Sequence, residues 1–384
     1  MKYQLEEVSI ELTGKCAMGC IMCSSGSTPN HSTEGELTPE EICNLIVDGR
    51  NLGATILSFS GGDPAVLPVE LLVRYIELAK DVGYEEILFY TTSVTQSVQY
   101  PTEPYRLYFK TLFQNSFLQY VRDIPGFKFV FSLHSYKPHV NDYIMGRQGV
   151  TQVIINSIEI AAGNGIECWV HCVPMLPNYK DVMGLRDLCA RLGVSKMSLL
   201  RFVPQTRGKA ANDQLALNDR QFAWLQQTME KMAGYKALDK HPVMVRFGCP
   251  IEFRHTVHSY ITHKIKACHA GTDLMLIRPD GSVHPCAAWK TLPQTDNIRD
   301  KSLAEIWATG KVFVAIREYM EAGYKDNEGC NQCQYNDSCK GGCPAQRLHW
   351  LKNEAGFEKV GLGDLYQHTA DPLCPEANHV NCAE

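Results

Sequence analysis

The chain has 384 residues and a formal net charge of −5 at pH 7, with 45% hydrophobic and 21% charged residues. These values are ordinary for a globular protein, and the lack of a dense Lys/Arg cluster argues against nucleic acid as a partner. No apolar run reaches the roughly 20 residues that a membrane span needs, and the N-terminus lacks the basic-then-apolar layout of a signal peptide. We therefore expect a cytoplasmic protein that binds neither membrane nor nucleic acid.

Segments rich in β-branched and aromatic residues alternate with helical patterns through the first half of the chain. The predicted strands are Val8–Leu12, Thr55–Phe59, Glu86–Tyr90, Lys128–Leu133, Glu167–Val173 and Lys196–Phe202. Between them, "TPEEICNLIVDGRNLG" predicts a helix with Thr38 as N-cap, Pro39 in the first turn and Gly53 at the end, and "VELLVRYIELAKDVG" a second helix. This alternation predicts an α/β fold, a partial (β/α)6 barrel of the TIM type.

Three regions follow from the change of pattern along the chain. The barrel is expected over residues 1–210, and "LNDRQFAWLQQTMEKMAG" predicts one long helix in a bridging region, 211–245. Residues 246–384 form a cysteine-rich domain with little periodicity and, we expect, little regular structure. Within the barrel, "YRLYFKTLFQNSFLQYV" predicts an amphipathic helix that either packs on the barrel or covers its site as a lid.

Sixteen cysteines are unusual for a long chain without a signal peptide. In a reducing compartment, clustered cysteines more often bind metal or iron–sulfur clusters than form disulfides. "GKCAMGCIMCSS" places Cys16, Cys20 and Cys23 directly after the first strand, at the sheet edge where ligands bind. Three thiolates in this spacing can hold three irons of a four-iron cluster and leave the fourth iron open. A zinc site completed by a distant ligand, or simply buried thiols, are the alternatives.

This loop, followed by six strand–helix units, resembles the radical S-adenosylmethionine (SAM) superfamily. The resemblance implies a four-iron four-sulfur cluster whose open iron is chelated by the amino and carboxylate groups of SAM. It also implies reductive cleavage of SAM to a 5′-deoxyadenosyl radical, which abstracts hydrogen from a substrate. In such enzymes the cofactor carries the difficult chemistry and the protein positions it. A reducing partner such as flavodoxin or ferredoxin is implied as well.

Short motifs at successive strand ends resemble the cofactor contacts of this family. "SFSGGDP" matches the Gly-Gly-Glu-Pro motif that holds the methionyl amino group, with Asp63 in place of Glu. "YTTS" and "FSLHS" resemble the ribose and carboxylate contacts, with His134 in place of the usual Asp. The resemblance assigns cofactor contacts to Met22, Gly61, Gly62, Asp63, Thr92, Ser132, Arg147 and Arg201.

The C-terminal cysteines occur in an order that resembles the SPASM extension of radical enzymes that modify peptides and proteins. Cys268 and Cys286 precede "CNQCQYNDSCKGGC", which contains Cys330, Cys333, Cys339 and Cys343, and Cys374 follows. Two zinc sites or a disulfide lattice are the alternatives. The resemblance implies two auxiliary four-iron four-sulfur clusters, and hence three clusters in total. It assigns the first auxiliary cluster to Cys249, Cys268, Cys286 and Cys343, and the second to Cys330, Cys333, Cys339 and Cys374. We expect Cys43, Cys168, Cys172 and Cys189 to be packing thiols.

The substrate predicted from this resemblance is a ribosomally made peptide with a leader, which the enzyme cross-links, epimerises or oxidises. Ala287 stands after Cys286, where sulfatase maturases tend to carry Asp, and this weakens that particular interpretation. A radical enzyme acting on a small metabolite or tetrapyrrole is one alternative. A non-enzymatic iron–sulfur electron-transfer protein is another, although the three-ligand loop and the Gly-Gly-Asp motif argue against it.

Overall fold

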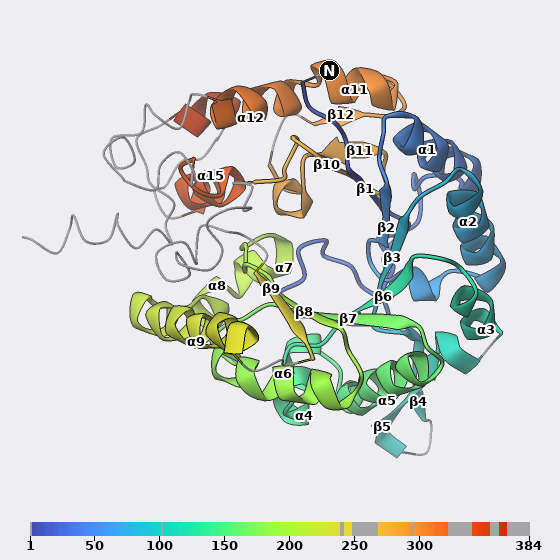
Figure 1. Cartoon of the computed structure of the whole chain (residues 1–384), viewed down its shortest axis with the longest axis vertical. Helices are drawn as coiled ribbons and strands as arrows, with labels where there is room; N and C mark the ends of the chain where they lie inside the picture. Colours follow the sequence, from blue (N-terminus) through green and yellow to red (C-terminus); the bar gives the residue numbers. More distant parts are fainter. Residues whose placement is uncertain are drawn as a thin grey trace, which may run out of the picture.

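The computed structural model describes residues 2–100, 103–114, 116–238, 242–247, 268–292, 295–321, 340–353 and 361–366. In these ranges the chain forms a curved sheet of ten strands and a separate two-stranded hairpin. Figure 1 shows the helices of the first half of the chain on the outer side of the curve, in the lower and right-hand parts of the molecule. None of the helices in the described part of the chain is long and apolar enough to cross a membrane.

Six parallel strands, neighbours in chain order, form the centre of the sheet. They are β1 (Glu7–Glu11), β2 (Ile56–Ser60), β3 (Glu86–Thr91), β6 (Phe127–Ser132), β7 (Glu167–Cys172) and β8 (Lys196–Leu199). The helices that connect them are α1 (Pro39–Asn51), α2 (Val69–Asp81), α3 (Phe117–Arg122), α4 (Pro138–Met145), α5 (Val150–Gly163) and α6 (Val182–Arg191). All six predicted strands are confirmed, and so is the partial barrel.

Helix α1 begins where its sequence predicts, because Thr38 and Glu41 form a capping box. The Thr38 hydroxyl accepts the Glu41 N–H at 3.2 Å, and the Glu41 carboxylate accepts the Thr38 N–H at 2.8 Å. Two of the helix's free N–H groups are thereby satisfied. The apolar face of α1 then buries Ile42, Leu45 and Ile46 against the sheet.

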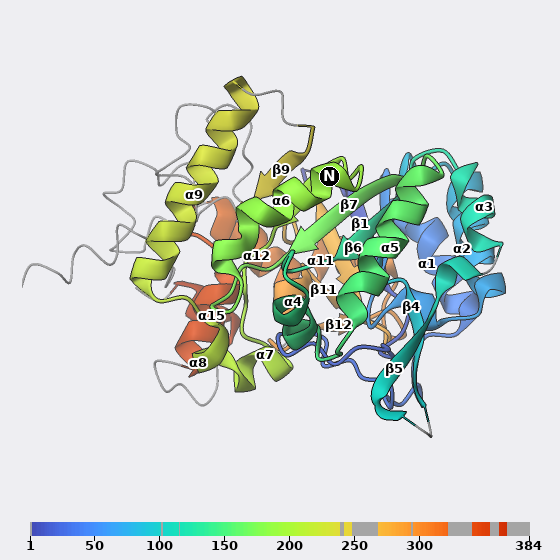
Figure 2. The same cartoon turned by 90° about the horizontal axis from the view of Figure 1, so that it is seen from below.

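The predicted amphipathic helix over residues 105–121 is wrong for most of its length. Residues Val94–Tyr100 and Glu103–Thr111 instead form strands β4 and β5 of an antiparallel hairpin, in which Val98 pairs with Tyr108. Only α3, at the end of the segment, is helical. Tyr, Phe and Thr favour strands, and pairing with β4 satisfies backbone groups of this segment, so tertiary pairing outweighs the apparent helical pattern. Figure 2 shows the hairpin extending away from the barrel.

The bridging region contains the predicted long helix, α9 (Asp219–Leu238), followed by β9 (Met244–Phe247), which adds to the sheet beside β8. On the other side, β10 (Leu274–Ile277) pairs in parallel with β1, and Glu7 lies opposite Leu274. The C-terminal region therefore extends the barrel's own sheet. The predicted limits of the three regions stay predictions.

The C-terminal region has more regular structure than its composition predicts. Its further strands are β11 (Ser282–His284) and β12 (Asp296–Asn297), and its helices are α11 (Leu303–Thr309), α12 (Lys311–Glu321) and α15 (Pro344–Asn353). Short helical turns complete the described elements: η1 (Pro64–Val66), η2 (Leu112–Gln114), η3 (Tyr179–Asp181), α7 (Thr206–Ala210), α8 (Asn212–Leu215), η5 (Ala287–Trp289) and η7 (Leu362–Tyr366). A separate apolar cluster that includes Trp289, Ile316 and Tyr319 packs this region. Burial of each such side chain contributes about 1.5–3 kcal/mol.

Candidate functional site: a cysteine loop at the strand ends

The three cysteine thiols in the loop after β1 lie close enough to interact electrostatically with one another. Burial raises the pKa of the Cys16 thiol well above its ordinary value, and Asp63, Cys20 and Cys23 raise it further. Burial and Cys23 raise the pKa of Cys20 to about 12, against the opposing charge of Arg207. The Cys16 and Cys20 thiols therefore favour the protonated form, and a bound metal would convert them into thiolate ligands.

Three neighbouring cysteine thiols are the donors that a four-iron cluster takes from a protein. In the ranges described, no three His, Cys, Asp or Glu side chains converge in a way that would hold a single metal ion. In a four-iron cluster each thiolate binds its own iron, so the three sulfur atoms need to surround a larger group and not meet at one point. The donor set of three neighbouring cysteines is therefore suited to such a cluster.

Two residues that follow β8 hold the cysteine loop by its backbone. The Arg207 guanidinium donates to the carbonyl oxygens of Cys20 at 3.0 Å, Gly26 at 3.1 Å and Ser27 at 2.7 Å. The Thr206 hydroxyl donates to the Cys23 carbonyl. Neither Arg207 nor Thr206 is among the site residues predicted from the sequence. Both lie close to the predicted Arg201, in the stretch "LLRFVPQTRGK".

The opposite side of the loop rests on the end of α4. The N–H groups of Gly19 and Ile21 donate to the carbonyls of Met145 and Ile144, at 3.2 and 3.0 Å. Arg147, predicted to contact the cofactor, donates to the Ala17 carbonyl at 3.3 Å. The loop is thus fixed from both sides, which preorganises the positions of its thiols.

Gly61 and Gly62 allow the end of β2 to approach the cysteine loop more closely than any larger residue could. A Cβ atom at position 62 would lie 1.9 Å from the Lys15 carbonyl oxygen, and one at position 61 would lie 2.5 Å from that of Thr13. The Gly62 N–H donates to Thr13 at 2.7 Å, and the Asp63 N–H donates to Lys15 at 2.9 Å. The two glycines therefore bring the end of β2 against the backbone of the cysteine loop.

Asp63 is buried, and its carboxylate accepts four hydrogen bonds from the chain. One oxygen accepts the Ala65 N–H at 3.0 Å and the Thr91 hydroxyl at 2.7 Å. The other accepts the N–H and the hydroxyl of Thr92, at 2.8 and 2.6 Å. Burial raises the pKa of Asp63, and these donors oppose the rise. Thr92, itself a predicted cofactor contact, therefore binds Asp63, and the two together join the ends of β2 and β3.

A buried ion pair links the cysteine loop to the C-terminal region. Glu11, at the end of β1, pairs with Lys290, and the Lys290 ammonium also donates to the Ser25 hydroxyl at 2.7 Å. Arg278 lies 3.5 Å from the same carboxylate. Burial opposes ionisation of Glu11, but Lys290, Arg278 and Ser25 outweigh it, and the pKa of the carboxyl is lowered.

Three cysteines of the C-terminal region lie close enough to influence one another. Burial raises the pKa of Cys268, and the nearby thiols of Cys343 and Cys286 raise it further. Burial and Cys343 likewise raise the pKa of Cys286 to about 12. These are three of the four ligands predicted for the first auxiliary cluster. The other predicted ligands lie outside the described residues: Cys249, Cys330, Cys333, Cys339 and Cys374.

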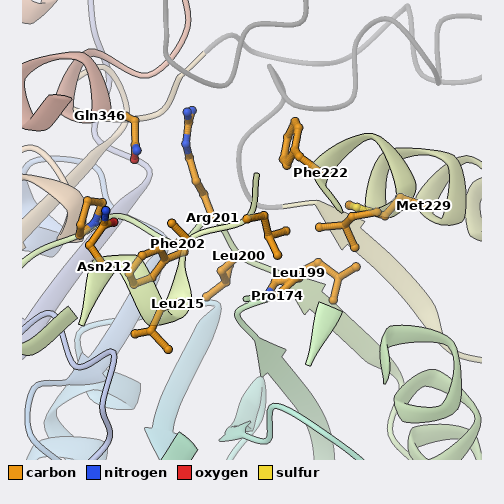
Figure 3. A pocket seen from close by; sticks show the side chains of 14 residues that line it. Pro174, Leu199, Leu200, Arg201, Phe202, Asn212, Leu215, Phe222, Met229 and Gln346 are labelled. Atoms are coloured by element: carbon orange, nitrogen blue, oxygen red, sulfur yellow. The ribbon is translucent and has the colours of Figure 1, made fainter. Parts of the chain in front are cut away.

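The remaining predicted contacts lie around the same strand ends. Ser132 ends β6, and Met22 packs beside the small apolar cluster of Ile144, Met175 and Leu215. Arg201 lies farther out and lines a cavity with Phe202 and other side chains (Figure 3). Cys168, Cys172 and Cys189 lie in the main core, as predicted for packing thiols, and Cys43 packs against it.

His134 places a neutral imidazole just beyond the end of β6. Its Nδ1 accepts the Val173 N–H at 3.2 Å, and its backbone N–H donates to Asn141 at 2.8 Å. Burial lowers the pKa of this histidine to about 4. A residue noted in the sequence only as a replacement for Asp is thus a hydrogen-bonded part of the strand-end structure.

Comparison with known families agrees with this geometry. The radical SAM superfamily matches residues 10–189, and the SPASM iron–sulfur cluster-binding domain matches residues 268–334. The chain belongs to the radical SAM superfamily. It is a radical SAM enzyme with a SPASM domain, and these two families account for SAM and iron–sulfur clusters as its cofactors.

Among curated relatives, this radical SAM enzyme is 24% identical over 351 residues to an AdoMet-dependent heme synthase of Methanosarcina barkeri, covering 87% of the chain and 90% of the relative. It is 26% identical over 355 residues to a PqqA peptide cyclase of Ruegeria pomeroyi, covering 91% and 85%. Its fold matches Streptococcus suis SuiB bound to S-adenosylmethionine, with a TM-score of 0.71, 17% identity, and coverage of 97% of this chain and 78% of SuiB. SuiB has also been solved with its precursor peptide SuiA.

Proposed function

We propose that this enzyme uses a SAM-derived radical to modify a ribosomally made peptide by cross-linking, epimerisation or oxidation. The observation that carries the radical chemistry is the three-cysteine loop, held at the carboxyl ends of the parallel strands by Arg207. The peptide substrate is supported by the likeness to a PqqA peptide cyclase and to SuiB, which binds a precursor peptide. The richness in cysteine suits the reducing cytoplasm, with a flavodoxin or ferredoxin as electron donor.

Three four-iron four-sulfur clusters are proposed, and the described cysteines divide between two of them. Cys16, Cys20 and Cys23 would hold the SAM-binding cluster, and Cys268, Cys286 and Cys343 would contribute to the first auxiliary cluster. When bound, the first cluster and SAM supply the radical that abstracts hydrogen from the substrate. The chain's own contribution is positional: Arg207, Arg147 and the Gly61–Gly62 turn fix the loop relative to the strand ends.

A second candidate, a radical enzyme acting on a tetrapyrrole, is favoured by the likeness to a heme synthase. A tetrapyrrole that carries several carboxylates would need several cations around it. The cavity at the ends of β7 and β8 has Arg201 as its single cationic lining residue among the described residues. This cavity alone is a poor match for a polyanionic ligand, and peptide modification is ranked first on the likeness to a PqqA peptide cyclase and to SuiB with its precursor peptide.

The function is tested with protein reconstituted in the absence of oxygen. Roughly 12 irons per chain are expected from three four-iron clusters. Replacement of Cys16, Cys20 and Cys23 together by Ala is expected to remove about one third of the iron and all 5′-deoxyadenosine formation. Cys43→Ala, which removes a half-buried thiol of α1, is the matched control and should retain both.

The substrate class is tested by offering two candidates to the active enzyme. One is a ribosomally made precursor peptide, and the other is a tetrapyrrole that carries several carboxylates. Mass spectrometry after incubation in deuterated water detects cross-linking or oxidation as loss of hydrogen, and epimerisation as incorporation of deuterium. Turnover of the tetrapyrrole alone would replace the peptide proposal, whereas absence of SAM cleavage with either would overturn the radical function itself.

A further inference from the structure

A mostly apolar cavity of about 80 Å³ lies beside the carboxyl ends of β7 and β8. Its walls come from three parts of the chain. Leu199, Leu200 and Phe202 belong to the end of β8, Phe222 and Met229 belong to α9, and further lining residues come from around α8 and from α15. Figure 3 shows these side chains around the space. The cavity therefore exists only when the barrel, the bridging helix and the C-terminal region are packed together.

One polar group in this cavity has no hydrogen-bond partner among the residues that the structure describes. Gln346, on α15, is 8% exposed, and its side-chain Oε1 is buried without a hydrogen bond. In Figure 3 the amide end of Gln346 points into the space, toward the side of Phe202 and Asn212. A buried acceptor that lacks its hydrogen bond costs about 1–3 kcal/mol. A ligand that donates one hydrogen bond to Gln346 would recover this cost.

The lining residues of the cavity indicate the chemistry of a ligand that would bind there. Partly exposed apolar side chains, among them Phe202, Leu217 and Phe222, favour an aliphatic or aromatic group of modest size. A small number of placed polar groups in an apolar cavity typically fixes a ligand's orientation. A peptide residue with an apolar side chain meets both requirements, because its backbone N–H is a donor directly beside that side chain.

We propose that this cavity is an anchor site for one apolar side chain of the substrate peptide, whose backbone N–H donates to Gln346. The proposal rests on the proposed peptide substrate. Two of the lining residues, Phe202 and Leu215, pack in the same apolar cluster as Met22 of the cysteine loop, so the cavity borders that loop. No cysteine is among the described residues that line the cavity, so the anchored side chain is held beside the loop and not at its thiols. Binding energy from contacts of this kind positions the reacting part of a substrate.

The test uses reconstituted full-length protein and capped pentapeptides, acetyl-Gly-Gly-X-Gly-Gly-amide, with Kd measured by ligand-observed NMR. With X as Leu, saturable binding is expected. With X as Gly or Asp, binding should weaken at least about tenfold, because the apolar burial is lost. Ala216→Phe places a ring in the cavity and should abolish binding of the Leu peptide.

The Gln346 contact is tested separately. Gln346→Met keeps the side-chain shape but removes the acceptor, and should weaken binding of the Leu peptide about three- to tenfold. A peptide N-methylated at Leu lacks the donor and should bind the wild type and Gln346→Met equally. The matched control is Gln214→Met, the same substitution at an exposed position on α8. It should leave every Kd unchanged.

Two results would overturn the anchor site: equal affinity for the Leu and Gly peptides, or a Gln346→Met effect that persists with the N-methylated peptide. Its failure is distinguishable from failure of the proposed function. If Ala216→Phe modifies the precursor peptide with an unchanged KM, the anchor is wrong and the function stands. If the pentapeptides bind as expected but only a tetrapyrrole is turned over, the binding site stands and the peptide function fails.

Discussion

Asp63→Asn is the substitution that most directly tests how the strand ends are held together. The two backbone donors on this carboxylate, Ala65 N–H and Thr92 N–H, bind different oxygens. Asn offers one acceptor oxygen and one NH₂ group, so in either orientation one of these N–H groups faces another donor. The threonine hydroxyls can rotate to become acceptors, but the backbone N–H groups cannot.

The expected cost follows from this geometry. One buried donor left unsatisfied costs about 1–3 kcal/mol, and the hydrogen bonds that remain lose their assistance from the negative charge. Asn carries no charge, so the free-energy cost of burying the Asp63 carboxylate, which raises its pKa, is absent in the variant. This offsets part of the loss in stability. We therefore expect the local structure to be destabilised by about 1–3 kcal/mol.

Hydrogen–deuterium exchange measures this loss where it arises. Peptides that cover the turn after β2 and the end of β3 should exchange about 5- to 100-fold faster in Asp63→Asn, while peptides from α1 should not change. Asp48→Asn, at an exposed position of α1, is the matched control and should have no effect. Unchanged exchange in both peptides of Asp63→Asn would refute the role of the four hydrogen bonds.

A SAM titration of Asp63→Asn and Thr91→Val distinguishes two roles for Asp63. The sequence predicts that Asp63 binds SAM directly, whereas the structure shows it joining the ends of β2 and β3. Thr91→Val removes one donor and leaves the carboxylate in place. If Asp63 binds the methionyl ammonium directly, Asp63→Asn should weaken SAM much more than Thr91→Val does. If Asp63 acts by joining the strand ends, the variant with the larger increase in hydrogen–deuterium exchange should also show the larger loss of SAM affinity.

Two further predictions concern buried charge. Burial lowers the folded-state pKa of both His134 and His284 to about 4, below the value of about 6.5 in an unfolded chain. The unfolded chain therefore binds these protons first, so the free energy of unfolding is highest above pH 6.5 and decreases as the pH falls toward 4. Each histidine should contribute up to about 1.4 kcal/mol per pH unit, and a stability profile of His134→Asn as steep as that of the wild type would contradict this. Among the described residues, Lys290→Met leaves Arg278 as the one cation beside buried Glu11, and should destabilise the protein by about 3 kcal/mol. Glu11→Gln in the Lys290→Met background should restore part of the loss in a double-mutant cycle by urea unfolding, and strictly additive effects would show that the pair contributes nothing.

The features that the sequence alone determined are local ones. Thr38, Pro39 and Glu41 specify the start of α1 within four residues, and the predicted helix is confirmed. The six strands are short runs of strand-forming residues between helices, so their order and type were predictable. The cysteine loop is likewise local, because its three thiols lie within eight positions of one another.

Only the tertiary structure decided which groups hold that loop, because their partners are remote in the chain. Arg207 is 187 positions from Cys20, and Lys290 is 265 positions from Ser25. No periodicity or spacing connects such residues. The same holds for β10, whose place beside β1 depends on backbone pairing between segments as remote in the chain as Glu7 and Leu274. The hairpin of β4 and β5 was missed for a related reason: its residues suit either helix or strand, and the hydrogen bonds between the paired strands decided in favour of the strand.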